Sequence, residues 1–159
     1  MFKPVGTLHR IAALLAALCI ATFLFASIGV ELFGTPQAVA KLKALIVAPG
    51  LWLLVPALAA TGASGFALAR GRRGRLVDAK KRRMPFIAAN GLLVLVPCAI
   101  VLQRWAAAGD FGAAFLAVQG IELLAGAANL TLIALNVRDG PRLAGRLRAP
   151  AAPAARTAP

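Results

Sequence analysis

The stretch 113–136 is apolar and long enough to span a membrane, yet it contains a glutamate near its middle. Its polar side chains recur at helical spacing, so they fall on one stripe of a helix. We call this stripe the polar seam; it consists of Gln119, Glu122, Asn129 and Asn136. Lipid cannot solvate a carboxylate. The polar seam is therefore expected to face other helices.

Three further apolar runs have the length of a membrane span, at residues 10–33, 42–69 and 84–107. The chain is 60% hydrophobic and only 14% charged, with a mean hydropathy of +0.81. A soluble domain of this size cannot bury so much apolar surface. The sequence predicts an all-α integral membrane protein. We expect an antiparallel bundle of four transmembrane helices, built as one domain over residues 1–137.

The first run also has the basic start and apolar centre of a signal peptide. It is long for such a segment, and Leu24 stands where cleavage after Ala26 would require a small residue. We expect an uncleaved helix. At the other end, residues 138–159 are basic and then rich in Ala and Pro, which predicts a disordered cytoplasmic tail.

The formal net charge of +13 comes from cations between and outside the apolar runs. Fifteen of the 18 Lys and Arg residues lie in the N-terminal segment, in the segment 70–83 and in the tail. This bias predicts that both termini are cytoplasmic, with anionic lipid headgroups rather than nucleic acid as the partner. The central segment forms the basic patch: Arg70, Arg72, Arg73, Arg75, Lys80, Lys81, Arg82 and Arg83.

The first connection predicts an ion pair at the membrane surface. In an antiparallel hairpin centred near Gln37, Glu31 lies level with Lys43. A pair at that place would be hydrated and weak, so its role would be structural.

Depth in the last two helices can be estimated across the connection 108–112. Pairing residues about this turn places Glu122 level with Pro97, and Asn129 level with Asn90. Asn90 and Asn129 are expected to hydrogen-bond between helices. Gln119 and Asn136 lie nearer the interfaces and are expected to be partly solvated. Prolines within helices predict kinks at Pro56 and Pro97.

Glu122 is the main candidate for function, as a proton or cation site or an anchor for an amine, together with Gln119, Asn129 and Asn90. The alternative is a neutral carboxyl group that hydrogen-bonds to a neighbouring helix. The depth estimate offers no cation at the level of Glu122.

The sequence offers few residues that could bind a cofactor or catalyse a reaction. Haem ligation by His9 would require Met84 or a second His9 as the other ligand, and a lone interfacial histidine is the simpler interpretation. Cys19 and Cys98 lie within apolar runs, as core residues do. We expect no metal, no cofactor and no enzymatic activity, because the motifs of hydrolases, metalloproteases and phosphate-binding loops are missing from the sequence.

Three classes of function remain open. The first is a non-enzymatic accessory, assembly or scaffold bundle of a bacterial inner membrane, as a homo-oligomer or within a larger complex. The second is a small-solute or proton-coupled carrier that uses Glu122, alone or as a dimer. The third is a redox or cofactor-binding protein, or an enzyme of another type. The bacterial assignment follows from the Ala, Gly and Arg bias, which is typical of GC-rich genomes.

Overall fold

The computed structural model describes residues 3–70 and 75–146, and within these ranges it contains helices and no strand. Four helical segments are long and apolar enough to cross a membrane: Pro4–Phe33, Pro36–Ala69, Arg82–Ala107 and Ala113–Arg138. The predicted all-helical chain with four such helices is therefore confirmed.

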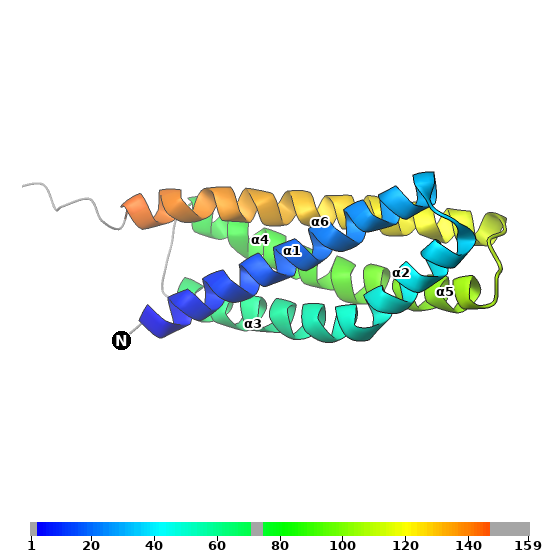
Figure 1. Ribbon diagram of the computed structural model, residues 1–159. Helices are drawn as coiled ribbons and strands as arrows, with labels where there is room; N and C mark the ends of the chain where they lie inside the picture. The colour runs from blue at the N-terminus through cyan, green and yellow to red at the C-terminus, as the bar shows by residue number, and fades with distance from the viewer. Residues whose placement is uncertain (1–2, 71–74, 147–159) are drawn as a thin grey trace, which may run out of the picture.

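Each apolar segment corresponds to one or more helical elements (Figure 1). The first is α1 (Lys3–Phe33), and the last is α6 (Ala113–Arg146). The two middle segments are each divided by a short π-helical stretch. The second consists of α2 (Pro36–Leu45), η1 (Ile46–Gly50) and α3 (Leu51–Ala69). The third consists of α4 (Arg75–Asn90), η2 (Gly91–Leu95) and α5 (Val96–Ala107).

The helices extend beyond the predicted ends for identifiable local reasons. Helix α2 begins at Pro36 rather than near residue 42. The Thr35 hydroxyl accepts a hydrogen bond from the Ala38 amide, and Pro36 occupies the first turn, where it needs no amide hydrogen. At the other end of the chain, α6 continues past Asn136 to Arg146, so the prediction of disorder is wrong for residues 138–146. Residues 147–159 of the predicted tail lie outside the described part.

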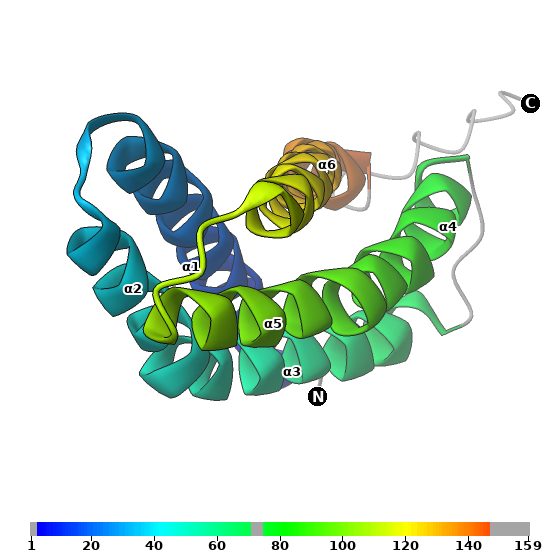
Figure 2. The same ribbon diagram turned by 90° about the vertical axis from the view of Figure 1, so that its right-hand side faces the viewer.

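Helix α1 packs against α3 and α6, whereas α2 packs against α5 and α4 packs against α6. The turns at 34–35 and 108–112 lie at one end of the molecule, which we call the loop end (Figures 1 and 2). Helix α1 begins and α6 ends at the opposite end, which we call the terminal end. At the loop end, Gly109 turns the chain with a φ of 74°, and Asp110 Oδ1 accepts a hydrogen bond from the Gly112 amide.

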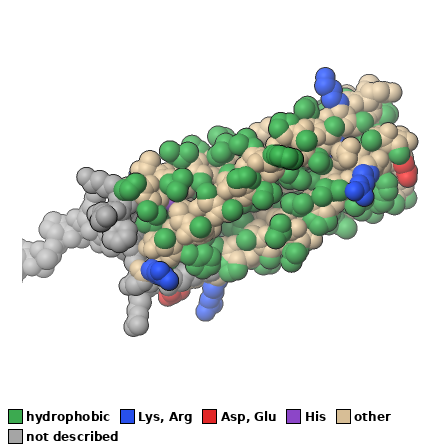
Figure 3. Space-filling model, turned by 90° about the horizontal axis from the view of Figure 1, so that it is seen from below, with side chains coloured by type: hydrophobic (Ala, Val, Ile, Leu, Met, Phe, Trp, Pro, Cys, Tyr) green, Lys and Arg blue, Asp and Glu red, His purple; other side chains and the backbone are tan. Residues whose placement is uncertain are grey.

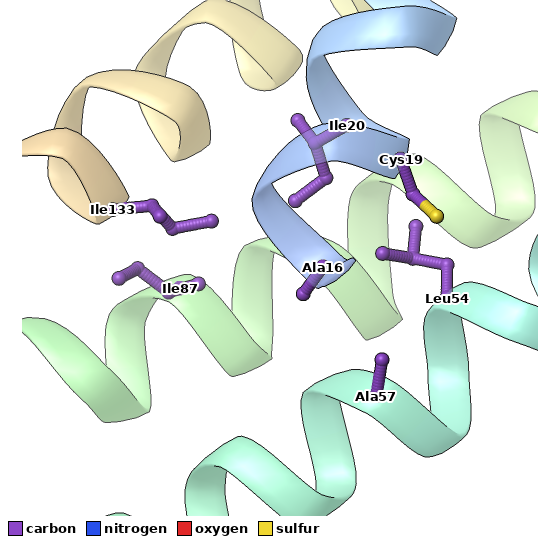
Figure 4. Packing of buried hydrophobic residues seen from close by; sticks show 7 residues of the cluster. All are labelled: Ala16, Cys19, Ile20, Leu54, Ala57, Ile87 and Ile133. Atoms are coloured by element: carbon purple, nitrogen blue, oxygen red, sulfur yellow. The ribbon is translucent and has the colours of Figure 1, made fainter. Parts of the chain in front are cut away.

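The buried apolar residues form two clusters. The larger joins α1, α3, α4 and α6 (Figure 4) and consists of Ala16, Cys19, Ile20, Leu54, Ala57, Ile87 and Ile133. The smaller lies toward the loop end and consists of Val39, Leu102, Ala106 and Phe115. Many other large apolar side chains, such as Phe33 and Trp52, point outward. In Figure 3 such side chains cover the middle of the visible face, with Lys and Arg toward its ends.

The second segment is interrupted at a different proline from the one predicted. Ala48, just before Pro49, has φ −141° and ψ 115°, which lies outside the helical region and marks a kink in η1. Helix α3 includes Pro56, and no residue with non-helical φ and ψ is found in it. The kink at Pro49 was not predicted, and the kink at Pro56 stays a prediction. Pro97 stands in the first turn of α5, directly after η2. A proline there cannot bond to the carbonyl of Leu93, which lies within η2.

Candidate functional site

Glu122 of α6 forms an ion pair with Lys43 of α2 inside the bundle. Lys43 Nζ lies 2.6 Å from Glu122 Oε2. The Lys43 side chain is fully buried, and 12% of the Glu122 side chain is exposed. Two expectations are therefore wrong. Glu122 does have a cation at its level, and Lys43 bridges to Glu122 rather than forming a hydrated pair with Glu31.

The helix start at Pro36 explains why Lys43 reaches the interior. Lys43 follows the buried Val39 by one helical turn, so the two side chains share the inner face of α2. Lys43 lies about 10 Å along the helix from Pro36, and Glu122 lies about 14 Å from the start of α6. A lysine side chain is long enough to span this difference. Had the Thr35–Pro36 pair been recognised as a helix start, the sequence would have indicated that Lys43 is inside the span.

Lys43 and Glu122 neutralise each other, so each side chain depends on its partner. A buried ion pair contributes little net stability, because the cost of removing both charges from water offsets their attraction. Removal of one partner alone leaves an uncompensated charge in a medium that cannot solvate it. Lys43 and Glu122 therefore fix the position of α2 against α6.

Two more ionisable side chains lie close enough to interact electrostatically with this pair. Glu31 of α1 interacts electrostatically with both Lys43 and Glu122. Cys98 of α5 interacts with the same two residues. We call Glu31, Lys43 and Glu122 the charged cluster. It joins three helices at the loop end of the molecule.

Gln119 is buried one turn before Glu122 on α6, with 4% of its surface exposed. Neither atom of its side-chain amide has a hydrogen-bond partner among the described residues, and the same holds for Glu31 Oε1. Asn136, toward the terminal end, is also buried at 8% exposure. The expectation that Gln119 and Asn136 are partly solvated is therefore wrong. Gln119, Asn129 and Asn136 of the seam are buried, and Glu122 is partly exposed.

Glu122 also lines a cavity of about 50 Å³. Glu122 and Ser27 supply its polar side chains, and residues such as Ile20, Leu54 and Leu95 supply apolar walls. A space of this volume can hold a few water molecules. Glu122 thus belongs to the charged cluster and also lines a small, mostly apolar cavity.

Asn129 of the seam is satisfied by direct hydrogen bonds, whereas Asn136 Oδ1 is buried without a partner among the described residues. Asn90 Nδ2 donates to Asn129 Oδ1 at 2.9 Å and to the Ala125 carbonyl at 3.0 Å. Asn129 is fully buried, and its Nδ2 donates to the Ile87 carbonyl at 3.3 Å. The predicted pairing of Asn90 with Asn129 is confirmed. These bonds hold α4 against α6.

His9 is tied to α3 near the terminal end. Its Nδ1 lies within hydrogen-bonding distance of the Thr61 carbonyl oxygen, at 3.2 Å, and of Ser64 Oγ, at 3.0 Å. Both the His9 ring and the Met84 side chain lie against Gly65, since a Cβ added there would contact His9 Cε1 and Met84. Met84 is therefore close to His9. Among the described residues, no group of three or more His, Cys, Asp and Glu side chains is placed to hold a metal ion.

The basic patch can be placed only in part. Arg70 and Arg82 are exposed, and Arg83 is half-buried. Arg72 and Arg73 lie outside the described residues, as do the side chains of Arg75, Lys80 and Lys81.

Comparisons with protein-family models, with curated proteins and with solved structures found no match to this chain. Any function must therefore be argued from the chemistry of these residues.

Proposed function

We propose that this protein is a non-enzymatic, multi-pass protein of a bacterial inner membrane and serves as an accessory, assembly or scaffold subunit. One observation carries the proposal. The central residues of the seam are paired with side chains of other helices, Glu122 with Lys43 of α2 and Asn129 with Asn90 of α4. Groups that are satisfied within the bundle hold helices together, and such interactions suit a rigid structural element.

The proposal includes an antiparallel bundle with both termini in the cytoplasm. Its support is the distribution of charge, since 15 of the 18 cations lie within residues 1–10, 70–83 and 137–159. Short basic segments stay on the cytoplasmic side of a membrane. The same segments would bind anionic headgroups there.

Flux measurements on proteoliposomes test the structural role. The full chain and its Glu122→Gln variant would be reconstituted with a pH-sensitive dye inside the vesicles. A structural bundle should not speed the decay of an imposed proton gradient beyond that of protein-free vesicles. It should nevertheless lose thermal stability on Glu122→Gln, because Lys43 loses its charged partner. Flux that depends on Glu122 would refute the proposal.

Crosslinking in the native membrane tests the assembly role. Photoreactive residues would replace exposed apolar side chains on different helices, for example Leu124 on α6, Phe66 on α3 and Leu14 on α1. A subunit of an assembly should give adducts of defined mass from one face, with the other faces crosslinking only to lipid. Lipid adducts at every position would contradict an assembly role.

A proton-coupled or small-solute carrier is the second candidate. It is favoured by the unpartnered Gln119 and by the cavity that touches Glu122. Groups that lack a partner at rest are available to a passing solute. The flux experiment separates the two functions, because only the carrier should lose transport when Glu122 becomes glutamine.

A further inference from the structure

The charged cluster has one negative charge too many. Glu31 and Glu122 supply two carboxylates, whereas Lys43 supplies one ammonium group. Lys43 Nζ is paired with Glu122 Oε2 at 2.6 Å. Within the described part of the chain, no ion pair joins Lys43 to Glu31. Glu31 is half-buried, and its Oε1 is buried without a partner among the described residues. A carboxylate withdrawn from water without a partner is more costly than a paired one. The charge balance therefore calls for one more positive charge near Glu31.

Gln119 provides an independent indication of a missing ligand. It is 4% exposed, and its amide oxygen and nitrogen are both buried without partners. Buried amides in native proteins almost always have hydrogen-bond partners. A ligand with a positive charge would satisfy the amide oxygen of Gln119 and the free oxygen of Glu31 together.

The layers of the bundle place Gln119 beside the charged cluster. Phe115 of α6 packs with Val39 of α2 and Leu102 of α5. One turn further in, Glu122 pairs with Lys43 and lies near Cys98. Gln119 stands between these two layers on the same buried face of α6, at the level where the Lys43 side chain passes inward.

We propose that Glu31, Gln119 and the Lys43–Glu122 pair form a binding site for one monovalent cation, a proton or a dehydrated alkali-metal ion. Glu31 is the acid that receives the charge, and Gln119 supplies a second oxygen. The Lys43–Glu122 pair is the fixed part of the site and keeps its own charges matched. This site is additional to the scaffold role and does not depend on it.

The two sources of the charge can be distinguished on the full chain in lipid nanodiscs. The first measurement is the melting temperature in chloride salts of lithium, sodium and potassium, against N-methylglucamine at equal ionic strength. The second is the infrared carbonyl stretch of protonated carboxyl groups, with isotope-labelled glutamate, over a range of pH. Both are made on the wild type, on Glu31→Gln and on the control Asp110→Asn. Asp110 is an exposed acid at the same end, and asparagine can keep its bond to the Gly112 amide.

A metal ion should raise the melting temperature by several degrees in the wild type and in Asp110→Asn, but not in Glu31→Gln. A proton should instead give a protonated-glutamate band that disappears at high pH and is missing from Glu31→Gln, with no difference between salts. Either result supports the site and names its ligand. The proposal is overturned if Glu31→Gln leaves both the salt response and the carboxyl band as they are in the wild type.

A second variant tests the same site if Glu31→Gln does not fold. Gln119→Leu removes the amide and keeps both carboxylates. It should weaken the apparent affinity for the metal ion, or shift the frequency of the carboxyl band, because Glu31 loses its neighbouring oxygen donor. An unchanged affinity and an unchanged band would refute the proposal. Failure of this site would leave the scaffold role intact, since that role rests on the paired residues.

Discussion

At the scale of single residues, Lys43 is the side chain on which the loop end of the bundle most depends. Lys43→Met should lower the free energy of unfolding by about 3–5 kcal/mol, because Glu122 would remain buried without its cation. The double variant Lys43→Met with Glu122→Leu should recover most of that loss. Thermal melting in detergent measures both effects.

Lys41→Met is the matched control for this prediction. Lys41 belongs to the same helix but is exposed, so its replacement should change stability by no more than about 0.5 kcal/mol. A double variant as unstable as Lys43→Met alone would show that the pair does not act as a unit.

Asn129 is the corresponding residue at the terminal half of the seam. Asn129→Leu removes the bonds to Asn90 and to the Ile87 carbonyl, which should cost about 1 kcal/mol and lower the melting temperature by a few degrees. Thr131→Val is the control. Thr131 is exposed and bonds only to the Ala127 carbonyl of its own helix among the contacts described. Equal effects of the two substitutions would mean that the seam is not a contact between helices.

The two halves of the seam differ in how far the sequence could predict them. Asn90 and Asn129 lie on helices joined by one short turn, so counting outward from that turn was enough to bring them together. Lys43 and Glu122 lie 79 positions apart, on helices that are not joined by one turn. Counting across the first turn pointed instead to Glu31, and only the direction of the long lysine side chain decided between the two acids.

At the scale of helices, the close approach of α1 to η1 depends on Gly50. A Cβ at Gly50 would lie 2.7 Å from Phe23 Cζ and 2.9 Å from the Leu45 carbonyl oxygen. The ring can move, but the carbonyl belongs to the backbone. Gly50→Ala should therefore destabilise the protein by about 1–3 kcal/mol, as measured by thermal melting.

Gly62→Ala is the control within the same span. A Cβ at Gly62 would have nothing within 4 Å, and Gly62 lies inside α3. Alanine there should be neutral or stabilise the helix by up to about 1 kcal/mol. A comparable loss in both variants would mean that the contact with Phe23 and Leu45 is not what makes Gly50 necessary.

The sequence predicted the helices well and their interruptions less well. Apolar runs bounded by Gly, Pro and charged residues fixed the number and order of the helices, because lipid-facing segments need long continuous hydrophobicity. The sequence does not distinguish Pro49 from Pro56, because both lie within the same apolar run. Which of them breaks the helix depends on how α2 and α3 pack against α1 and α5, and that is not encoded locally.

At the scale of the whole molecule, the loop end and the terminal end differ in charge, and this difference predicts the orientation in the membrane. Cysteine labelling with a membrane-impermeant maleimide measures it. Gln37→Cys lies on α2 at the loop end, and Asp78→Cys lies on α4 near the basic patch; both positions are exposed. In intact bacterial cells whose outer membrane admits the reagent, Gln37→Cys should be labelled, whereas Asp78→Cys should react only after the inner membrane is opened.

The unsubstituted chain is the control for this labelling, because Cys19 is buried and Cys98 is half-buried inside the bundle, so neither should react. The reverse pattern would place the basic segments outside, against the attraction of anionic headgroups and the bias that retains Lys and Arg in the cytoplasm. It would also change the meaning of the charged cluster. With the loop end outside, Glu31 and Gln119 lie nearer the periplasmic surface, so a cation would enter their site from that side. A reversed bundle would draw the cation from the cytoplasm instead.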